Sequence, residues 1–302
     1  MYSKFELSDS AEISAKVFAT KLALFAIAIV LAGALAASGR GVVLVPIELI
    51  IIWLTYWYSD RIALFSMGAT IVSYSEAPHL HAAIEKLSHQ AGIPKPQVAI
   101  SDRSIPNAFA AGRNAKNSVV CVTRGLQGCL TEEEVEAVVA HEIGHIVNRD
   151  VAVMTFASIT GAIAGIWMQS EIFNPPRNPD GGRKSGKSEA VGVASAVAIY
   201  TLTILLILAL SRYREFAADR VSGILTTRPR DLASALQKMH LEMARGVSRD
   251  LLSTEPMNTL LISPALNPDR KRSIGHLFST HPPLEQRIEK LLELEKQLGL
   301  TN

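Results

Sequence analysis

The chain has 302 residues, a net charge of +2 and 48% hydrophobic residues, and its mean hydropathy is +0.22. A mean hydropathy above zero is high for a soluble domain and predicts membrane-spanning segments, and the near-balanced charge argues against nucleic acid as the main partner. The two cysteines, Cys121 and Cys129, are too few for a disulfide framework and form no CxxC pair, so we expect free buried thiols.

The first 58 residues predict a membrane hairpin. Apolar runs cover residues 17–37 and 42–58, each of a length that can cross a bilayer, with a very short turn between them. The first run is too long for the apolar region of a cleavable signal peptide. Aromatic residues at the end of the second run suit a membrane interface. Glu48 lies inside that run, where a carboxyl is costly; a functional and a purely structural role are equally open.

Residues 59–150 predict a first soluble block. Apolar residues at helical spacing favour a helix that ends near Gly92. Runs rich in β-branched residues indicate strands at residues 96–101 and 118–123, and the small-residue stretch 106–112 between them is compatible with an edge strand. We therefore expect a small sheet ahead of the helix that closes the block.

That helix carries the sequence TEEEVEAVVAHEIGHIVNRD, in which Thr131 and Glu134 form a capping box. His141 and His145 are four residues apart, so both imidazoles leave one side of the helix and can reach one Zn²⁺. Glu142 is placed to take a proton from a water that the metal activates. The alternative is a pair of surface histidines on an amphipathic helix.

Two further apolar runs predict a second membrane hairpin, residues 151–211. Residues 151–168 contain a GxxxG spacing that lets helices approach closely, although a buried hydrophobic helix is an alternative at this length. Residues 191–210 are a clearer span, and a loop rich in Pro, Gly and charge, residues 171–189, separates the two.

Residues 212–302 predict a second soluble block, with helices at residues 231–245 and 284–298 and a proline-punctuated loop at residues 253–272. Four spans put both soluble blocks on one side of the membrane, as a shared site requires. Lys and Arg residues flanking the spans are slightly more numerous on that side, which favours a cell membrane location with the catalytic side in the cytoplasm.

A catalytic zinc shell needs a third protein ligand besides two histidines. Glu215 and Asp219 are four residues apart on a predicted helix after the last apolar run, so they share a face. We predict that Glu215 is the third ligand and that Asp219 accepts the free N–H of a ligand histidine, which fixes its tautomer. On spacing alone, a solvated acidic pair among the neighbouring arginines is an equally good interpretation.

Three motifs in this order, HEIGHIVNRD, REFAAD and a late HPP, resemble the HtpX-type membrane metalloproteases, which are gluzincins related to the CaaX prenyl endopeptidases. The resemblance runs from about Glu76 to the C-terminal helix. It implies a zinc endopeptidase with one Zn²⁺ per chain. The roles that it implies are the metal ligands His141, His145 and Glu215, the general base Glu142, and the carboxylate Asp219 behind a ligand histidine.

The resemblance also implies roles that spacing does not reach. Asn107 matches a substrate-side strand residue that donates to the reacting carbonyl, and His281 is similar to a histidine that helps to hold the oxyanion. Arg287 matches an arginine placed near Asp219. An edge-strand turn residue, and an ordinary helix start with a surface charge, are the corresponding alternatives.

The expected fold class is mainly α with a small β-sheet: an integral membrane protein with about four transmembrane helices and a zincin-like catalytic domain made of both soluble blocks. If the motif helix is continuous, His145 lies about 9 Å from the span that begins at Val151. We therefore expect protein or peptide substrates near the lipid bilayer, bound to residues 106–112 by strand addition, and a role in protein quality control.

Two other classes of protein are alternatives. An intramembrane zinc protease would place HExxH inside an apolar span and would use an NPDG segment, here residues 178–181. The four glutamates ahead of His141 argue against it, because a lipid-buried span does not tolerate them. A non-catalytic membrane scaffold or chaperone would need no completed zinc shell.

Overall fold

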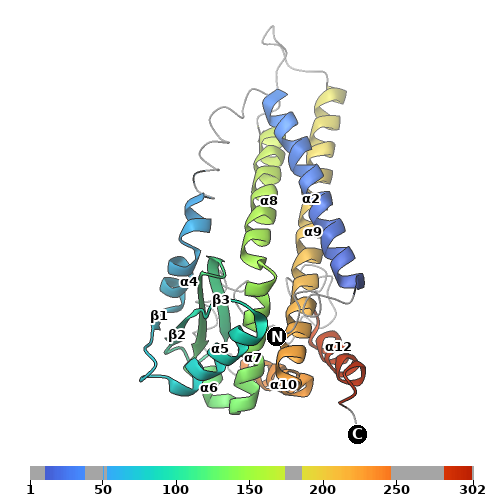
Figure 1. Ribbon diagram of the computed structural model, residues 1–302. Helices are drawn as coiled ribbons and strands as arrows, with labels where there is room; N and C mark the ends of the chain where they lie inside the picture. The colour runs from blue at the N-terminus through green and yellow to red at the C-terminus, as the bar shows by residue number, and fades with distance from the viewer. Residues whose placement is uncertain (1–10, 38–49, 51–52, 174–185, 246–281, 301–302) are drawn as a thin grey trace.

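The computed structural model describes residues 11–37, 50, 53–173, 186–245 and 282–300. The fold is mainly helical with one four-stranded sheet, so the expected fold class is confirmed (Figure 1). The helices are α2 (Ala11–Ala37), α4 (Ser59–Met67), α5 (Pro78–Ala91), α6 (Arg124–Cys129), α7 (Glu132–Val147), α8 (Asp150–Phe173), α9 (Gly186–Thr226), α10 (Pro229–Arg245) and α12 (Leu284–Gln297). The strands are β1 (Ala69–Ile71), β2 (Gln97–Ser101), β3 (Ala108–Asn114) and β4 (Asn117–Thr123).

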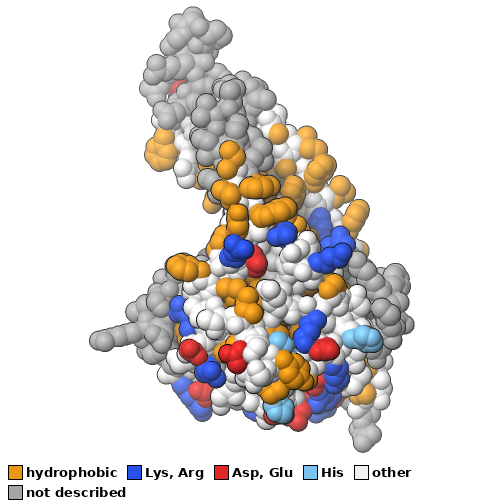
Figure 2. Space-filling view, turned by 60° about the vertical axis from the view of Figure 1, so that its left-hand side comes forward, with side chains coloured by type: hydrophobic (Ala, Val, Ile, Leu, Met, Phe, Trp, Pro, Cys, Tyr) orange, Lys and Arg blue, Asp and Glu red, His pale blue; other side chains and the backbone are white. Residues whose placement is uncertain are grey.

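Three helices in the described part of the chain are long and apolar enough to cross a membrane: α2, α8 and α9. They run side by side away from the sheet (Figure 1), and Figure 2 shows hydrophobic side chains gathered over this narrow part and charged ones over the broad part. Buried Leu24, Ala157 and Leu210 pack where the three meet. A Cβ on Gly161 would lie 2.9 Å from an Ile207 methyl, so the GxxxG spacing does bring α8 close to α9.

One expected membrane feature differs in extent from the observed helices, and another lies mostly outside the described residues. The predicted loop at residues 171–189 is helical at both ends, because α8 continues to Phe173 and α9 begins at Gly186. The prolines that predict this loop, and the NPDG segment with them, lie outside the described residues. Most of the predicted span at residues 42–58, including Glu48, also lies outside them.

The sheet has the strand order β1-β2-β4-β3, so β3 is an edge strand. Strands β2 and β4 are parallel, and β1 and β3 are antiparallel to their neighbours. The predicted strands at residues 96–101 and 118–123 correspond to β2 and β4, and the predicted edge strand corresponds to β3. Strand β1 has no signal in the sequence, because three residues are too few for an alternating pattern.

One hydrophobic core joins the two soluble blocks. Helices α5, α7 and α10 contribute buried Ile84, Val138 and Leu236, which pack in one cluster with Val120 of β4 and Leu291 of α12. Residues from both sides of the α8–α9 hairpin are therefore buried together. This packing brings α7 and α9 into contact, which the site requires.

Helix α4 and the residues before it fasten the edge strand. Buried Met67 of α4 packs with Phe109 of β3 in a second cluster. At the far end of β3, the guanidinium of Arg113 lies 4.3 Å from the Trp57 ring centroid, and the Tyr56 hydroxyl donates to the Arg113 carbonyl at 2.8 Å. The aromatic residues that predict a membrane interface therefore hold one end of β3.

The motif helix is not continuous with the apolar helix that follows. Helix α7 ends at Val147, α8 begins at Asp150, and Arg149 between them has φ = 56°, in the left-handed region that a non-glycine residue rarely adopts. The distance of about 9 Å expected from a continuous helix is thus not applicable, because the chain changes direction at this point.

Candidate metal centre

Helix α7 presents the two motif histidines on one side. The capping box forms as predicted: the Glu134 N–H donates to Thr131 Oγ1, and the Thr131 N–H donates to the Glu134 carboxylate. His141 is fully buried, and the side chain of His145 is 14% exposed. Their Nε2 atoms are 3.2 Å apart. The Nε2 atoms of His141 and His145 therefore face one small space between them rather than solvent.

Helix α9 brings Glu215 to the same space. Its carboxylate oxygens lie 3.7 Å from Nε2 of His141 and 3.6 Å from Nε2 of His145. The close approach depends on Gly144, because a Cβ there would lie 3.0 Å from Cα of Ala218, one turn after Glu215. The ligand atoms of the three residues all lie within 4.8 Å of one another.

These separations fit a metal ion. Bonds of 2.0–2.1 Å in a tetrahedral shell place neighbouring ligand atoms about 3.3 Å apart. The observed separations of 3.2, 3.6 and 3.7 Å are close to that value. The donor set of two imidazoles and one carboxylate is one that catalytic zinc uses, with a fourth position left for water or substrate. The residues present therefore suit a catalytic divalent metal.

A carboxylate and an arginine stand behind His141. Nδ1 of His141 lies 2.9 Å from Asp219, and a carboxylate can only accept, so Nδ1 carries the proton and Nε2 keeps its lone pair. Arg287 of α12 donates to both Asp219 oxygens at 2.8 and 2.6 Å and lies 3.5 Å from Glu215. Burial alone lowers the pKa of Arg287, but the Asp219, Glu215 and Glu142 charges outweigh burial and raise that pKa, so Arg287 stays cationic.

His145 also has a carboxylate partner, Asp150, which the spacing of the motif did not predict. Nδ1 of His145 lies 2.7 Å from Asp150, and the guanidinium of Arg214 lies 3.1 Å from the other Asp150 oxygen. The available signal was an acidic residue five positions after His145, immediately before an apolar run. In an uninterrupted helix Asp150 would point away from His145. The break in the helix at Arg149 turns Asp150 back toward His145.

Glu142 is buried beside the ligands and is 2% exposed. Desolvation lowers the pKa of His145, but the Asp150 hydrogen bond and the charges of Glu215, Asp150 and Glu142 outweigh it, so that pKa is raised. The centre therefore has a negative potential that attracts a cation. The Glu142 charge contributes to the raised pKa of both His145 and Arg287.

The roles of Asn107 and His281, which the resemblance implies, stay predictions. Asn107 is fully buried immediately before β3, and its backbone N–H donates to Thr123 Oγ1 at 2.9 Å. Its proposed contact with a reacting carbonyl stays a prediction. His281 lies outside the described residues.

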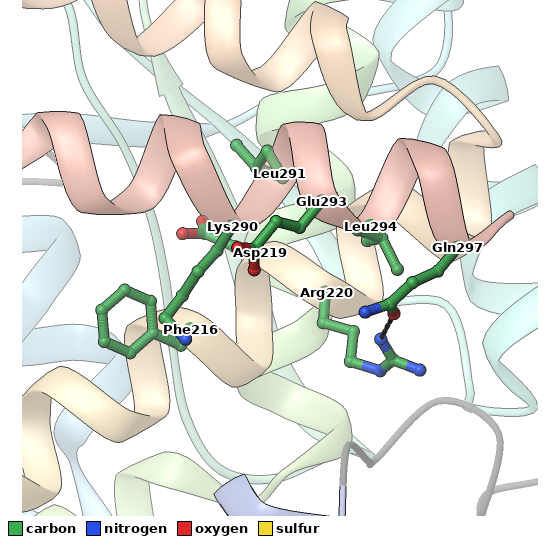
Figure 3. Close-up of a pocket in the computed structure, with 8 residues that line it drawn as sticks. All are labelled: Phe216, Asp219, Arg220, Lys290, Leu291, Glu293, Leu294 and Gln297. Carbon is green, nitrogen blue, oxygen red and sulfur yellow. Dashed lines mark hydrogen bonds between the residues drawn. The ribbon is translucent and has the colours of Figure 1, made fainter. Parts of the chain in front are cut away.

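A small cavity of about 70 Å³ lies behind Asp219, between α9 and α12. Figure 3 shows Asp219 at this cavity and Arg220 donating to Gln297, at 3.3 Å. The ammonium of Lys290 lies 4.8 Å from the Phe216 ring centroid. These contacts fasten α12 to α9 and so hold Arg287 against Asp219. The residues around this cavity therefore support the candidate metal centre through Asp219.

Of the two cysteines, Cys121 is a free buried thiol as expected, whereas Cys129 is only partly buried.

Comparisons with known proteins agree with this geometry. The model of Peptidase family M48 matches residues 74–295. Protease HtpX homolog 1 of Streptomyces coelicolor is 44% identical over 267 residues, which cover 85% of this chain and 84% of that protein. Protease HtpX homolog of Moorella thermoacetica is 42% identical over 296 residues, which cover 97% and 98%. Protease HtpX homolog of Pyrococcus abyssi is 40% identical, with 87% and 90% covered.

The crystal structure of S. mikatae Ste24p matches with a TM-score of 0.46 and 17% identity, covering 89% of this chain and 66% of that chain. The resemblance to the HtpX-type proteases is confirmed by the family match and the relatives. Because the family match spans most of the chain and includes all three residues of the candidate metal centre, the chain belongs to peptidase family M48.

Proposed function

We propose that this membrane-associated metalloprotease is a zinc endopeptidase that cleaves membrane proteins or misfolded segments close to the bilayer surface. The observation that carries the proposal is the convergence of His141, His145 and Glu215 on one space, with a carboxylate behind each histidine. Such carboxylates fix the histidine tautomer and raise the basicity of the ligand nitrogen. Two histidines and one glutamate, with a fourth position left open, are a ligand set that catalytic zinc uses, which is why we propose zinc.

Peptide hydrolysis at this centre would use Glu142 as the general base. A divalent metal held by the three ligands supplies Lewis acidity, which polarises the peptide carbonyl and lowers the pKa of water. Glu142 takes the proton from the attacking water and delivers it to the nitrogen of the leaving amine as the C–N bond breaks. Asn107 and His281 are the proposed donors to the carbonyl oxygen, and removing one such donor typically costs about 10²–10³ in rate.

The edge strand β3 is the proposed substrate platform. Within the described part of the chain, β3 pairs with β4 alone, and its other side faces away from the sheet. An extended peptide can add to such an edge through backbone hydrogen bonds with little dependence on sequence. One end of β3 is held by Trp57 and Tyr56, residues of a kind that lie at a membrane interface. A segment bound there would therefore lie near the bilayer.

The arrangement of the membrane helices supports a membrane-proximal reaction. Glu215 lies on α9, on the same uninterrupted helix as the apolar run expected at residues 191–210 and only five residues past Leu210. We propose the four-part division into residues 1–58, 59–150, 151–211 and 212–302, with both soluble blocks in the cytoplasm, from the distribution of basic residues around the apolar runs.

The experiment that tests the function is digestion of a casein-type substrate by the full chain in detergent. Wild type should cleave the substrate, a chelator should abolish cleavage, and added Zn²⁺ should restore it. Glu142→Gln should keep its metal and lose turnover, because the variant lacks only the proton acceptor. Full activity of Glu142→Gln would remove this residue from the mechanism, and activity in chelator would overturn the metal requirement.

The alternatives make different predictions for the same protein. An intramembrane protease would have its motif helix in lipid, whereas α7 has exposed or half-buried acidic residues at its start, among them Glu132 and Glu133. A non-catalytic scaffold needs no third ligand. Measuring bound zinc in wild type and Glu215→Ala separates a scaffold from an enzyme, because only the metal centre loses zinc on this substitution.

A further inference from the structure

Asp150 is the first residue of α8, and its two carboxylate oxygens have different partners. One oxygen lies 2.7 Å from Nδ1 of His145, and the other lies 3.1 Å from the guanidinium of Arg214 on α9. All three side chains are buried or nearly so, with exposures of 14%, 4% and 15% for His145, Asp150 and Arg214. The contacts are thus shielded from water. In such a buried environment a charged pair fixes the orientation of its side chains more strongly than a pair at the surface does.

The backbone has to depart from a regular helix for this contact to form. In a continuous α-helix, a residue five positions after His145 would lie about 140° around the axis and about 7.5 Å further along. The left-handed φ of 56° at Arg149 ends α7 and starts α8 in a new direction, and this turn returns Asp150 to His145. A non-glycine residue in that region is strained, and such strain persists where surrounding contacts hold it.

The two histidines therefore have matching supports that come from different parts of the molecule. His141 is backed by Asp219, which Arg287 of the C-terminal helix α12 holds. His145 is backed by Asp150, which Arg214 holds, and both of these residues lie on the helices that form the candidate membrane hairpin.

We propose that Asp150 is a positioning residue for the metal ligand His145 and that Arg214 acts on the metal centre through Asp150. This inference rests on the proposed zinc site. Asp150 holds the proton on Nδ1, so that Nε2 presents its lone pair to the metal, and Arg214 holds the carboxylate in its orientation. The α8–α9 hairpin thereby sets the position of one ligand histidine as well as carrying Glu215.

The test is zinc affinity, measured on the full chain in detergent by competition with a chromophoric chelator, with the thermal unfolding midpoint recorded for each variant. Asp150→Asn should bind zinc about 10–100-fold more weakly than wild type. Arg214→Gln should show a smaller loss, and the double variant should match Asp150→Asn, because Arg214 acts only through the carboxylate. The visible spectrum of the Co²⁺-substituted protein should also change in Asp150→Asn.

A matched control distinguishes positioning from general stability. Arg103 is half-buried and donates to the carbonyl oxygens of Met67 and Ser66 in α4, at 3.2 Å each. Arg103→Gln should therefore lower the unfolding midpoint without changing zinc affinity or the Co²⁺ spectrum.

The outcomes are separable. If wild type binds no zinc, the proposed function fails and this inference with it. If wild type binds zinc and Asp150→Asn binds it equally well, only this inference is overturned. An Arg214→Gln loss that adds in full to the Asp150→Asn loss would also overturn it. If Asp150→Asn does not fold, Arg214→Gln decides. Unchanged zinc affinity of Arg214→Gln overturns the proposal, and weakened affinity, with the zinc affinity of Arg103→Gln unaffected, supports it.

Discussion

Gly144 sits where α7 and α9 approach closely beside the candidate metal centre, and adding a single methyl group there should misplace the candidate ligands. A Cβ at Gly144 would lie 3.0 Å from Cα and 3.2 Å from the carbonyl oxygen of Ala218, and 3.2 Å from Cβ of Val221. Ordinary carbon contacts are about 3.5–4.0 Å, so the overlap is about 0.5 Å. The neighbours are backbone atoms and a Cβ, which cannot rotate away, so the two helices must separate.

The size of the effect follows from that displacement. Gly144→Ala gains about 1 kcal/mol of helix propensity, and overpacking costs about 1–3 kcal/mol, so the variant should be destabilised by up to about 2 kcal/mol. Because a displacement of 1 Å can cost about 10² in rate, a shift of half that size should lower the cleavage rate roughly tenfold. Zinc affinity should fall as well, since Glu215 moves with α9 while His141 and His145 move with α7.

The assay compares initial cleavage rates, zinc affinity and unfolding midpoints in one detergent. Gly128→Ala is the matched control, because a Cβ at Gly128 has no atom within 4 Å among the described residues. It should leave the rate and the affinity unchanged and should not lower the midpoint. If Gly144→Ala cleaves and binds zinc as wild type does, the close approach of the helices does not position the ligands and the reasoning is refuted.

Three further predictions concern single charged or thiol groups. Glu134→Gln should cost about 1–3 kcal/mol near neutral pH, because the Glu134 carboxylate accepts from Lys238. Burial raises the pKa of Glu134, but its hydrogen bonds outweigh burial and hold that pKa below its ordinary 4.5. The stabilisation by the Glu134 carboxylate is thus complete above about pH 4.5 and is lost as the pH falls through the lowered pKa. The unfolding midpoints of wild type and Glu134→Gln should therefore converge in acid, and a constant difference between them would contradict this. Arg287→Lys should weaken zinc binding, because lysine cannot hold Asp219 through two parallel N–H groups, and unchanged affinity would contradict it. Burial, with a smaller effect from the Glu142 charge, raises the pKa of Cys121 to about 12, so mass spectrometry should show its alkylation only after denaturation.

Local patterns in the sequence predicted much of the fold. The capping box at Thr131, the αL glycine that ends α5 at Gly92, and the strands β2 and β4 are encoded by residues within a few positions of one another. The four-residue spacing of His141 and His145 likewise predicted that both side chains leave the same side of α7. Such features depend on backbone geometry over one or two turns, so a single chain is enough to find them.

Features that depend on contacts between distant segments could not be read in the same way. The turn at Arg149 has no glycine or proline to mark it, and the contact of Asp150 with His145 depends on that turn. The continuity of α9 through Ser211–Thr226 was hidden by the change from apolar to charged residues, although the helix itself is uninterrupted. That Glu215 and Asp219 turn inward rather than toward solvent follows from the packing of α9 against α7 and α12.

The uninterrupted course of α9 links the lipid to the reaction. At 1.5 Å per residue, its 41 residues extend for about 60 Å, roughly twice the hydrocarbon depth of a bilayer. A membrane helix of this length adapts to a thinner or thicker bilayer by changing its tilt. Glu215 lies about 7.5 Å past Leu210 along α9. A change of about 5° in the tilt of α9 therefore displaces Glu215 by a sizeable fraction of an ångström relative to His141 and His145. Acyl-chain length should therefore be a variable of turnover for this enzyme, independent of the substrate it is given.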